Sequence, residues 1–184
     1  LCSLKRENGE KLGKAGKRGA VISFMGEYPD EAWSFDVGSI HYEGWFYQGN
    51  SSDEFSSAYG RNVRSKEKKG GTCWLPGGAG AMGQMHTKLA VESEDGPLRI
   101  LVSDMDNTRI ENVKKLLADT IKKRNIEFKT LNPASFESPA QFEEEVRKFA
   151  PDGFDDIIML VPVIPVLNSS AKFLKKDGLM NIFA

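Results

Sequence analysis

The sequence predicts an α/β protein in which a parallel β-sheet carries helices on both faces. Three observations support this fold class. From residue 72 onward, short apolar runs alternate with longer amphipathic stretches, as in successive β-α-β units. A glycine-rich segment, residues 77–83, follows the first apolar run. The fourth strand expected, residues 156–161, contains the unbroken apolar run Ile-Ile-Met-Leu-Val, which is typical of a parallel strand buried on both sides.

The first two strand–helix pairs follow directly from this alternation. Strands are expected at residues 72–75 and 99–103, and helices at residues 81–92 and 108–124. The second helix has one apolar face at helical spacing, formed by Ile110, Val113, Leu116, Leu117 and Ile121.

The remaining elements continue the pattern. Residues 138–149 indicate a helix, with Ser138 as its cap and Pro139 in its first turn. We also expect a helix that begins near residue 164 or 165 and ends before Gly178, and strands at residues 127–131, 156–161 and 179–183. Because crossovers between parallel strands are right-handed, these elements predict one sheet with helices on both faces.

The first 70 residues follow a different pattern. They predict helices at residues 4–17 and 52–64 and strands at residues 20–24 and 45–48. Residues 14–24 and 173–183 share a lysine-rich helix end, a glycine and an apolar strand closed by phenylalanine. This similarity indicates that the N-terminal segment is the C-terminal part of a preceding unit of the same kind, and chance similarity is the alternative. The expected domains are therefore a partial unit at 1–66 and a complete one at 67–184.

Charge and hydropathy argue against nucleic acid and membranes as partners. The 184 residues carry a formal net charge of −1, which gives no global field to attract a polyanion. The basic residues 61–69 are expected to form a solvated helix end and linker, with a patch for phosphate or an acidic partner as the alternative. No segment approaches the ~20 apolar residues that span a bilayer.

Cysteine and histidine usage favours a cytoplasmic protein without a metal site of its own. Cys2 and Cys73 give no disulfide framework, which fits a reducing compartment. Neither they nor His41 and His86 have the spacing of metal ligands, and both histidines are expected to be structural. Because the chain begins at a leucine and stops on an expected strand, we interpret it as part of a longer protein.

The glycine-rich segment has the spacing of a strand–turn–helix that binds a dinucleotide. Gly78 would permit a tight turn, Gly80 would let a diphosphate approach the backbone, and Gly83 would let helix and strand pack closely. The amides near Ala81 and Met82 would point at the phosphates from a helix N-terminus. A glycine-rich turn without a ligand is the alternative.

An acidic residue stands where a Rossmann-like domain binds ribose. Asp104 ends the second strand, 21 residues after Gly83, and would accept hydrogen bonds from the adenosine ribose. Its charge would repel a 2′-phosphate, which favours NAD over NADP, although Arg109 would partly offset this by pairing with a phosphate. The alternative for Asp104 is a solvated carboxylate or a helix cap. Asp106 is expected to cap the next helix.

Several segments together resemble the medium-chain (zinc alcohol dehydrogenase-like) reductases, and most of all their sorbitol/L-sorbose 1-phosphate reductase branch. The resemblance covers most of residues 17–184 and is carried by residues 40–42, 49–52, 75–86, 102–104, 153–158 and 177–184. Two features depart from that family. The segment similar to the end of its cofactor domain precedes the glycine loop, and the domain that carries the catalytic zinc has no counterpart here.

The resemblance also implies where the nicotinamide half of a cofactor would lie. Val161 and Pro162 end the fourth strand and Phe183 ends the fifth, and by resemblance they line that half of the cleft. Ordinary core packing is the alternative for Val161 and Phe183. Asp155 and Asp156, which precede the fourth apolar run, are expected to form a solvated turn.

The function expected from these features is the NAD(P)-binding domain of an oxidoreductase that acts on a polyol or sugar phosphate. The cofactor would supply hydride chemistry, a zinc ion is expected only in the missing domain, and a homo-oligomer is left open. Two alternatives remain. One is an S-adenosylmethionine-binding methyltransferase domain, and the other is a nucleotide-sensing or dimerisation module without catalysis.

Overall fold

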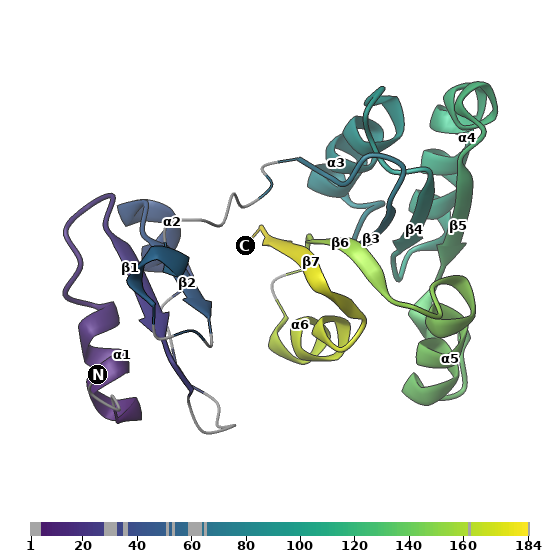
Figure 1. The fold of residues 1–184 in the computed structure, drawn as a ribbon. Helices are drawn as coiled ribbons and strands as arrows, with labels where there is room; N and C mark the ends of the chain where they lie inside the picture. Colours follow the sequence, from purple (N-terminus) through teal and green to yellow (C-terminus); the bar gives the residue numbers. More distant parts are fainter. Residues whose placement is uncertain are drawn as a thin grey trace. The chain divides into compact units, whose positions relative to one another are not determined.

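The computed structural model describes residues 5–27, 33–34, 37–50, 52, 54–58, 64, 66–161 and 163–183. The chain divides into two compact units, Leu1–Val63 (unit 1) and Arg64–Ala184 (unit 2), both visible in Figure 1. None of the helices in these described stretches is long and apolar enough to cross a membrane.

Unit 2 is built on a five-stranded parallel sheet in the order β5-β4-β3-β6-β7. The strands are β3 (Thr72–Pro76), β4 (Arg99–Ser103), β5 (Glu127–Leu131), β6 (Phe154–Met159) and β7 (Leu174–Ile182). Within unit 2, the chain enters the sheet at its central strand β3, moves outward through β4 to β5, and then returns to the other side of β3 at β6. The connections after β3 and β6 therefore diverge, which leaves a crevice at the carboxyl edge between these two strands.

Helices cover both faces of this sheet, which confirms the predicted Rossmann-like fold (Figure 1). α3 (Ala81–Glu92) and α4 (Asn107–Arg124) pack on one face, and α5 (Pro139–Phe149) and α6 (Ile164–Ala171) pack on the other. Alternate residues of β3 enter opposite cores. Cys73 and Leu75 contact the residues of α3 and α4, whereas Trp74 contacts those of α5. Because both faces are covered, the central strands are apolar throughout.

Trp74 is the centre of the second core. Its ring lies 5.4 Å from Phe154 and 5.7 Å from Phe173, measured between ring centroids. Its indole N–H donates to Ser103 Oγ at 3.0 Å, so the polar atom of this buried side chain is satisfied. This contact ties the middle of β3 to the carboxyl end of β4.

The last helix and strand differ from the prediction. α6 ends at Ala171 instead of near Gly178, and β7 begins at Leu174. The pairing with β6 shifts register, because Phe154 faces Leu174 while Asp156 faces Leu179. The intervening lysine-rich segment resembles a helix end in sequence, but it forms an irregular stretch of strand. Gly178 fits this irregularity because a Cβ there would lie 2.9 Å from the Phe154 carbonyl oxygen.

Unit 1 contains α1 (Arg6–Gly13), β1 (Val21–Met25), α2 (Val37–Glu43), β2 (Phe46–Asn50) and the short 3₁₀ helix η1 (Phe55–Ala58). β1 and β2 pair in parallel from Val21–Phe46 to Met25–Asn50, as the last strands of a doubly wound sheet do. The helix expected at 52–64 is reduced to η1 in the described part, and residues 59–63 lie outside it.

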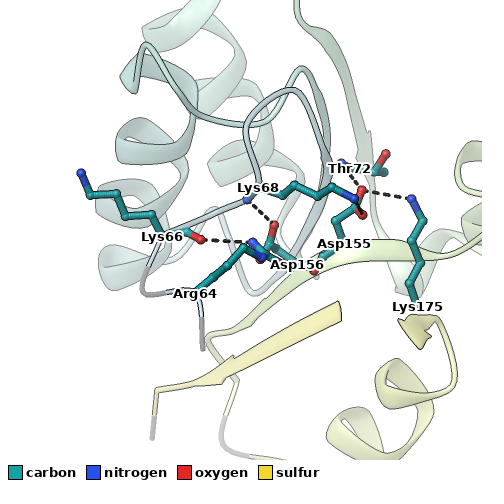
Figure 2. Close-up of polar contacts among 7 residues, drawn as sticks. All are labelled: Arg64, Lys66, Lys68, Thr72, Asp155, Asp156 and Lys175. Carbon is teal, nitrogen blue, oxygen red and sulfur yellow. Dashed lines mark hydrogen bonds and ion pairs between the residues drawn. The ribbon is translucent and has the colours of Figure 1, made fainter. Parts of the chain in front are cut away.

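The prediction for Asp155 and Asp156 is wrong, since both are buried inside β6 at the amino-terminal edge of the sheet (Figure 2). Asp155 accepts hydrogen bonds from Lys68 Nζ at 2.7 Å, from the Thr72 N–H at 3.0 Å and from Lys175 Nζ at 3.0 Å. Buried carboxylates require such partners. The sequence pattern missed them because they come from residues about 20 to 90 positions away.

Burial alone would raise the pKa of Asp155, but the hydrogen bonds from Lys68, the Thr72 backbone and Lys175 outweigh it and lower the pKa to about 2. A lowered pKa in the folded protein means that the carboxylate stabilises the fold at neutral pH. This contribution is complete above the ordinary value of 3.8 and is lost as the pH falls through 2.

We therefore predict that Asp155→Asn lowers the free energy of unfolding of unit 2 by about 2 kcal/mol at neutral pH. The difference from the native protein should shrink as the pH falls from 3.8 toward 2, because the native carboxylate then becomes protonated. Urea denaturation at a series of pH values measures this. A difference that stayed constant across the series would mean that the charge of Asp155 contributes nothing.

Candidate functional site

The loop between β3 and α3 turns at Gly77, one residue before the glycine that the sequence pattern assigned to this role. Gly77 has a φ of +77°, which L side chains rarely adopt. A Cβ there would lie 2.5 Å from Val161 Cγ2. Its N–H donates to the Ser103 carbonyl oxygen at 2.7 Å, so the turn is anchored to the end of β4. In the sequence, the adjacent glycines 77 and 78 were the feature that could have indicated a turn at Gly77.

Gly78 and Gly83 let α3 pack directly on this loop. A Cβ on Gly83 would overlap the Gly77 carbonyl oxygen and lie 2.6 Å from the Gly78 carbonyl carbon. At Gly78 it would lie 3.0 Å from Thr87 Oγ1. Thr87, which sequence reasoning did not single out, donates to the Gly78 carbonyl oxygen at 2.8 Å and is fully buried. The loop conformation is thus fixed from the helix side.

Gly80, by contrast, faces open space. A Cβ there would meet only the Gly77 carbonyl oxygen, at 3.4 Å. Gly80 is the N-cap of α3 and supplies no side-chain hydrogen bond, whereas Asp106 caps α4 and Ser138 caps α5. As at the start of any helix, the N–H groups of Ala81 and Met82 have no intrahelical acceptor, and Gly80 offers them no side-chain acceptor either. An uncapped helix N-terminus of this kind favours an anion.

A cavity of about 290 Å³ lies at the carboxyl edge of the sheet, beside this loop. Among the predicted site residues it brings together Gly80, Asp104, Arg109 and Val161. Gly78 and Gly83 lie behind the loop, and Ala81 and Met82 are exposed on the first turn of α3. The full lining is Pro76, Gly77, Gly80, Ser103, Asp104, Met105, Arg109, Pro133, Leu160, Val161 and Val166.

Asp104 and Asp106 lie close together at the end of β4 but have different hydrogen-bond partners. Asp104 follows β4 directly, is half-buried, and accepts the Asp106 N–H through Oδ1 at 3.1 Å. Its Oδ2 has no hydrogen-bond partner among the described residues. Asp106 caps α4 by accepting from the N–H groups of Thr108 at 2.8 Å and Arg109 at 3.1 Å, which confirms the predicted cap. The Arg109 guanidinium pairs with Asp106 at 3.5 Å.

The structure describes two of the three residues expected to line the nicotinamide half of the cleft, Val161 and Phe183. Val161 packs beside Gly77 at the end of β6, and Pro162 lies outside the described residues. Phe183 follows β7 and donates its N–H to the Met159 carbonyl oxygen at 2.9 Å. Its ring contacts His86 of α3, with 4.2 Å between centroids, and is not part of the 290 Å³ cavity.

A second cavity of about 270 Å³ lies next to the first and shares Ser103, Pro133 and Val166 with it. Its deeper walls include the rings of Trp74 and Phe142. The polar loop and Asp104 therefore border a largely apolar space, which is the combination typical of small-molecule sites.

Clusters of metal ligands are absent from the described stretches of the chain, where no three His, Cys, Asp or Glu side chains come together in a way that would hold an ion. The one described cysteine, Cys73, is fully buried in β3. Burial, with Asp156 and Glu67 nearby, raises its thiol pKa well above the ordinary value.

Comparison with known proteins finds two curated relatives of this chain. The chain is 30% identical over 118 residues to mannitol-1-phosphate 5-dehydrogenase of Aliivibrio fischeri (strain ATCC 700601 / ES114), and 33% identical over 118 residues to the uncharacterized protein YggP of Escherichia coli (strain K12). Each match covers 64% of this chain and 27% of the relative, so the chain spans about a quarter of the relatives' length. No family model matches the sequence.

The glycine geometry predicts a sharp contrast between two single substitutions. Gly83→Ala should lower the free energy of unfolding of unit 2 by about 1–3 kcal/mol, because the new methyl group overlaps rigid loop backbone. Gly80→Ala, the matched control, should cost under about 1 kcal/mol, the scale of a changed N-cap, because its Cβ enters open space. Chemical denaturation of both variants measures the difference, and equal losses would contradict the packing described for Gly83.

Proposed function

We propose that unit 2 binds a nicotinamide dinucleotide, as the cofactor-binding part of an oxidoreductase that acts on a polyol or sugar phosphate. What supports this most is the uncapped N-terminus of α3, opened by Gly80, beside a cavity that contains Asp104. The similarity to mannitol-1-phosphate 5-dehydrogenase supports the reaction class and the substrate class. The finer assignment, an L-sorbose 1-phosphate reductase-like enzyme of the medium-chain reductases, rests on the sequence resemblance.

The residues at the carboxyl edge fit the parts of such a cofactor. The diphosphate would accept hydrogen bonds from the N–H groups of Ala81 and Met82, at the positive end of the α3 dipole. Oδ2 of Asp104 would accept from a ribose hydroxyl. The apolar residues Met105, Pro133 and Val166 line the cavity beside Asp104 and would contact the adenine base.

The nicotinamide would lie on the other side of the diphosphate, toward Val161, Pro162 and Phe183. When bound, the nicotinamide ring supplies hydride transfer to or from a carbonyl carbon. Unit 2 would orient the ring and exclude water from one of its faces. We assign the activation of the substrate oxygen to parts of the enzyme other than unit 2.

NAD is the expected cofactor in preference to NADP. The Asp104 carboxylate would lie where the 2′-phosphate of NADP would have to fit. Two negative charges so close together repel each other, which disfavours NADP. Arg109, the nearest cation in the cavity lining, is already paired with Asp106.

The central prediction is that unit 2 binds NADH and that Gly80→Val weakens this binding. The branched side chain would fill the space over the first N–H groups of α3 and should weaken binding at least tenfold, or about 1.4 kcal/mol. Fluorescence titration of NADH measures the affinity, and circular dichroism checks the fold. Met85→Ala, on the exposed side of α3, is the control and should bind as the native protein does.

Two other outcomes of this titration would overturn the proposal. Saturable binding of S-adenosylmethionine without binding of NADH would assign unit 2 to methyl transfer. Binding of neither compound, by a protein that is folded and forms a stable oligomer, would assign it to the class of non-catalytic modules.

Cofactor choice gives a separate prediction. Asp104→Asn should weaken NADH binding about tenfold, because charge-assisted hydrogen bonds to the ribose become neutral ones, and should narrow the preference over NADPH. Glu111→Gln is the control. Glu111 is an exposed acid of α4 that pairs with Lys114 and lies outside the cavity lining, so its replacement should leave the ratio of NADH to NADPH affinity unchanged. Competition titrations with both cofactors give this ratio, and an unaltered ratio in Asp104→Asn would exclude Asp104 as the ribose ligand.

A further inference from the structure

Residues Arg64 and Lys66–Lys68, here called the strap, precede β3 and lie against the amino-terminal edge of the unit 2 sheet (Figure 2). Arg64 donates through Nη1 to Asp156 Oδ1 at 2.8 Å and through Nη2 to the Asp155 carbonyl oxygen at 3.0 Å. The Lys68 N–H donates to Asp156 Oδ2 at 2.7 Å. Each oxygen of the Asp156 carboxylate therefore holds one end of the strap.

Polar contacts are what attach the strap. Lys66 and Lys68 are exposed, Arg64 and Glu67 are half-buried, and none of these residues belongs to either hydrophobic core. Their remaining contacts to β6 run through Lys68 Nζ, which pairs with Asp155. Because no apolar side chain anchors the strap, its attachment depends on the charge of the carboxylates beneath it.

The carboxylates of Asp155 and Asp156 bond to different parts of unit 2. Asp155 bonds to the Thr72 N–H of β3 and to Lys175 of β7 as well as to Lys68, so it joins the strands of the sheet. Both hydrogen bonds of the Asp156 carboxylate go to the strap. We propose that Asp156 is a latch, whose ionised carboxylate holds the strap closed and whose neutralisation releases the strap while the sheet stays folded.

The pKa values of Asp155 and Asp156 are shifted in opposite directions, as this proposal requires. Burial raises the pKa of Asp156 in spite of the hydrogen bonds from Lys68 and Arg64, whereas the pKa of Asp155 is lowered to about 2. As the pH falls, Asp156 therefore takes up a proton before Asp155 does. The strap is held above the raised pKa and released below it, because a neutral carboxyl no longer attracts the Arg64 guanidinium.

The other charged or titratable groups near Asp156 leave this order unchanged. The strap contributes Arg64, which pairs with Asp156, and Lys68, which pairs with Asp155. The Cys73 thiol of β3 has a raised pKa and stays neutral. Glu67 of the strap raises the pKa of Asp156 further, and Lys175 of β7 pairs with Asp155.

Release of the strap has a defined reach. Arg64 is the first residue of unit 2, so the strap lies where the chain enters this unit. The glycine loop and Asp104 lie at the opposite, carboxyl edge of the parallel sheet. Release of the strap therefore affects the start of unit 2 and leaves the candidate cofactor site intact.

Limited trypsin digestion of the full chain tests the latch, because Arg64, Lys66 and Lys68 are cleavage sites within the strap. Asp156→Asn should speed cleavage at these sites about tenfold, the scale of a lost charge-assisted hydrogen bond, with mass spectrometry identifying the sites. Arg64→Gln, which removes the partner without altering β6, also removes one cleavage site and should speed cleavage at the two that remain, Lys66 and Lys68. Asp95→Asn is the matched control, because Asp95 pairs with Lys69 in an exposed ion pair on the adjoining segment and should leave cleavage unchanged.

Labelling of Cys73 separates release of the strap from unfolding of the unit. In a Cys2→Ser background, the reaction of Cys73 with a thiol reagent reports opening of the core. The latch requires faster strap cleavage with unchanged labelling of Cys73. Cleavage and labelling that accelerate together would show general loosening and overturn the proposal, as would cleavage at the native rate in Asp156→Asn.

Amide hydrogen exchange of Lys68 tests the pH dependence in the native protein. Its N–H should lose protection as the pH falls, whereas in Asp156→Asn the protection should be low at every pH. Retained protection of the native Lys68 amide through the acid range, or a protection in Asp156→Asn equal to that of the native protein, would exclude a proton-driven latch.

Discussion

The contact between Gly83 and the backbone of Gly77 and Gly78 is the constraint on which the architecture of unit 2 depends. It sets how closely α3 approaches the end of β3, and there is no room for even a methyl group between them. This approach allows Thr87 to bond the Gly78 carbonyl and leaves Gly80 as an N-cap without a side chain. The polar surface at the carboxyl edge is thus a direct product of steric packing.

The polar groups at the two edges of the unit 2 sheet differ in whether they are hydrogen-bonded. At the carboxyl edge, the N–H groups of Ala81 and Met82 and one oxygen of Asp104 have no hydrogen-bond partner among the residues that the structure describes. At the amino edge, every carboxylate oxygen of Asp155 and Asp156 is bonded. Unsatisfied groups next to a cavity suit a ligand, whereas satisfied buried groups fix the conformation of the chain.

Elements governed by local sequence could be predicted well. The limits of α3, β4 and β5 agree with the pattern because each combines a clear period with glycine, proline or capping residues at its ends. The cap at Asp106 follows from the same local logic. Gly80 and Asp104, which both line the 290 Å³ cavity, were singled out because a fixed spacing links them to a strand and a helix.

Features that depend on distant partners could not be predicted. β7 begins early because its lysine-rich start is held by pairing with Phe154 and by the bond from Lys175 to Asp155, and neither is visible in a local window. Asp155 and Asp156 resemble a turn until Arg64, Lys68 and Thr72 are brought to them. Thr87 was missed because its role is a hydrogen bond to Gly78, nine residues earlier in the loop, which a helical pattern does not reveal.

The order of the strands also has a kinetic consequence. The segment from β3 to β5 is contiguous, so it assembles through short-range contacts. Pairing Cys73 with Asp156, however, closes a loop of more than 80 residues, which is entropically slow. The rate-limiting step of folding should therefore be the docking of β6 beside β3. Until it occurs, one edge of β3 is bare, and the nascent chain is most prone to associate with other chains during that interval.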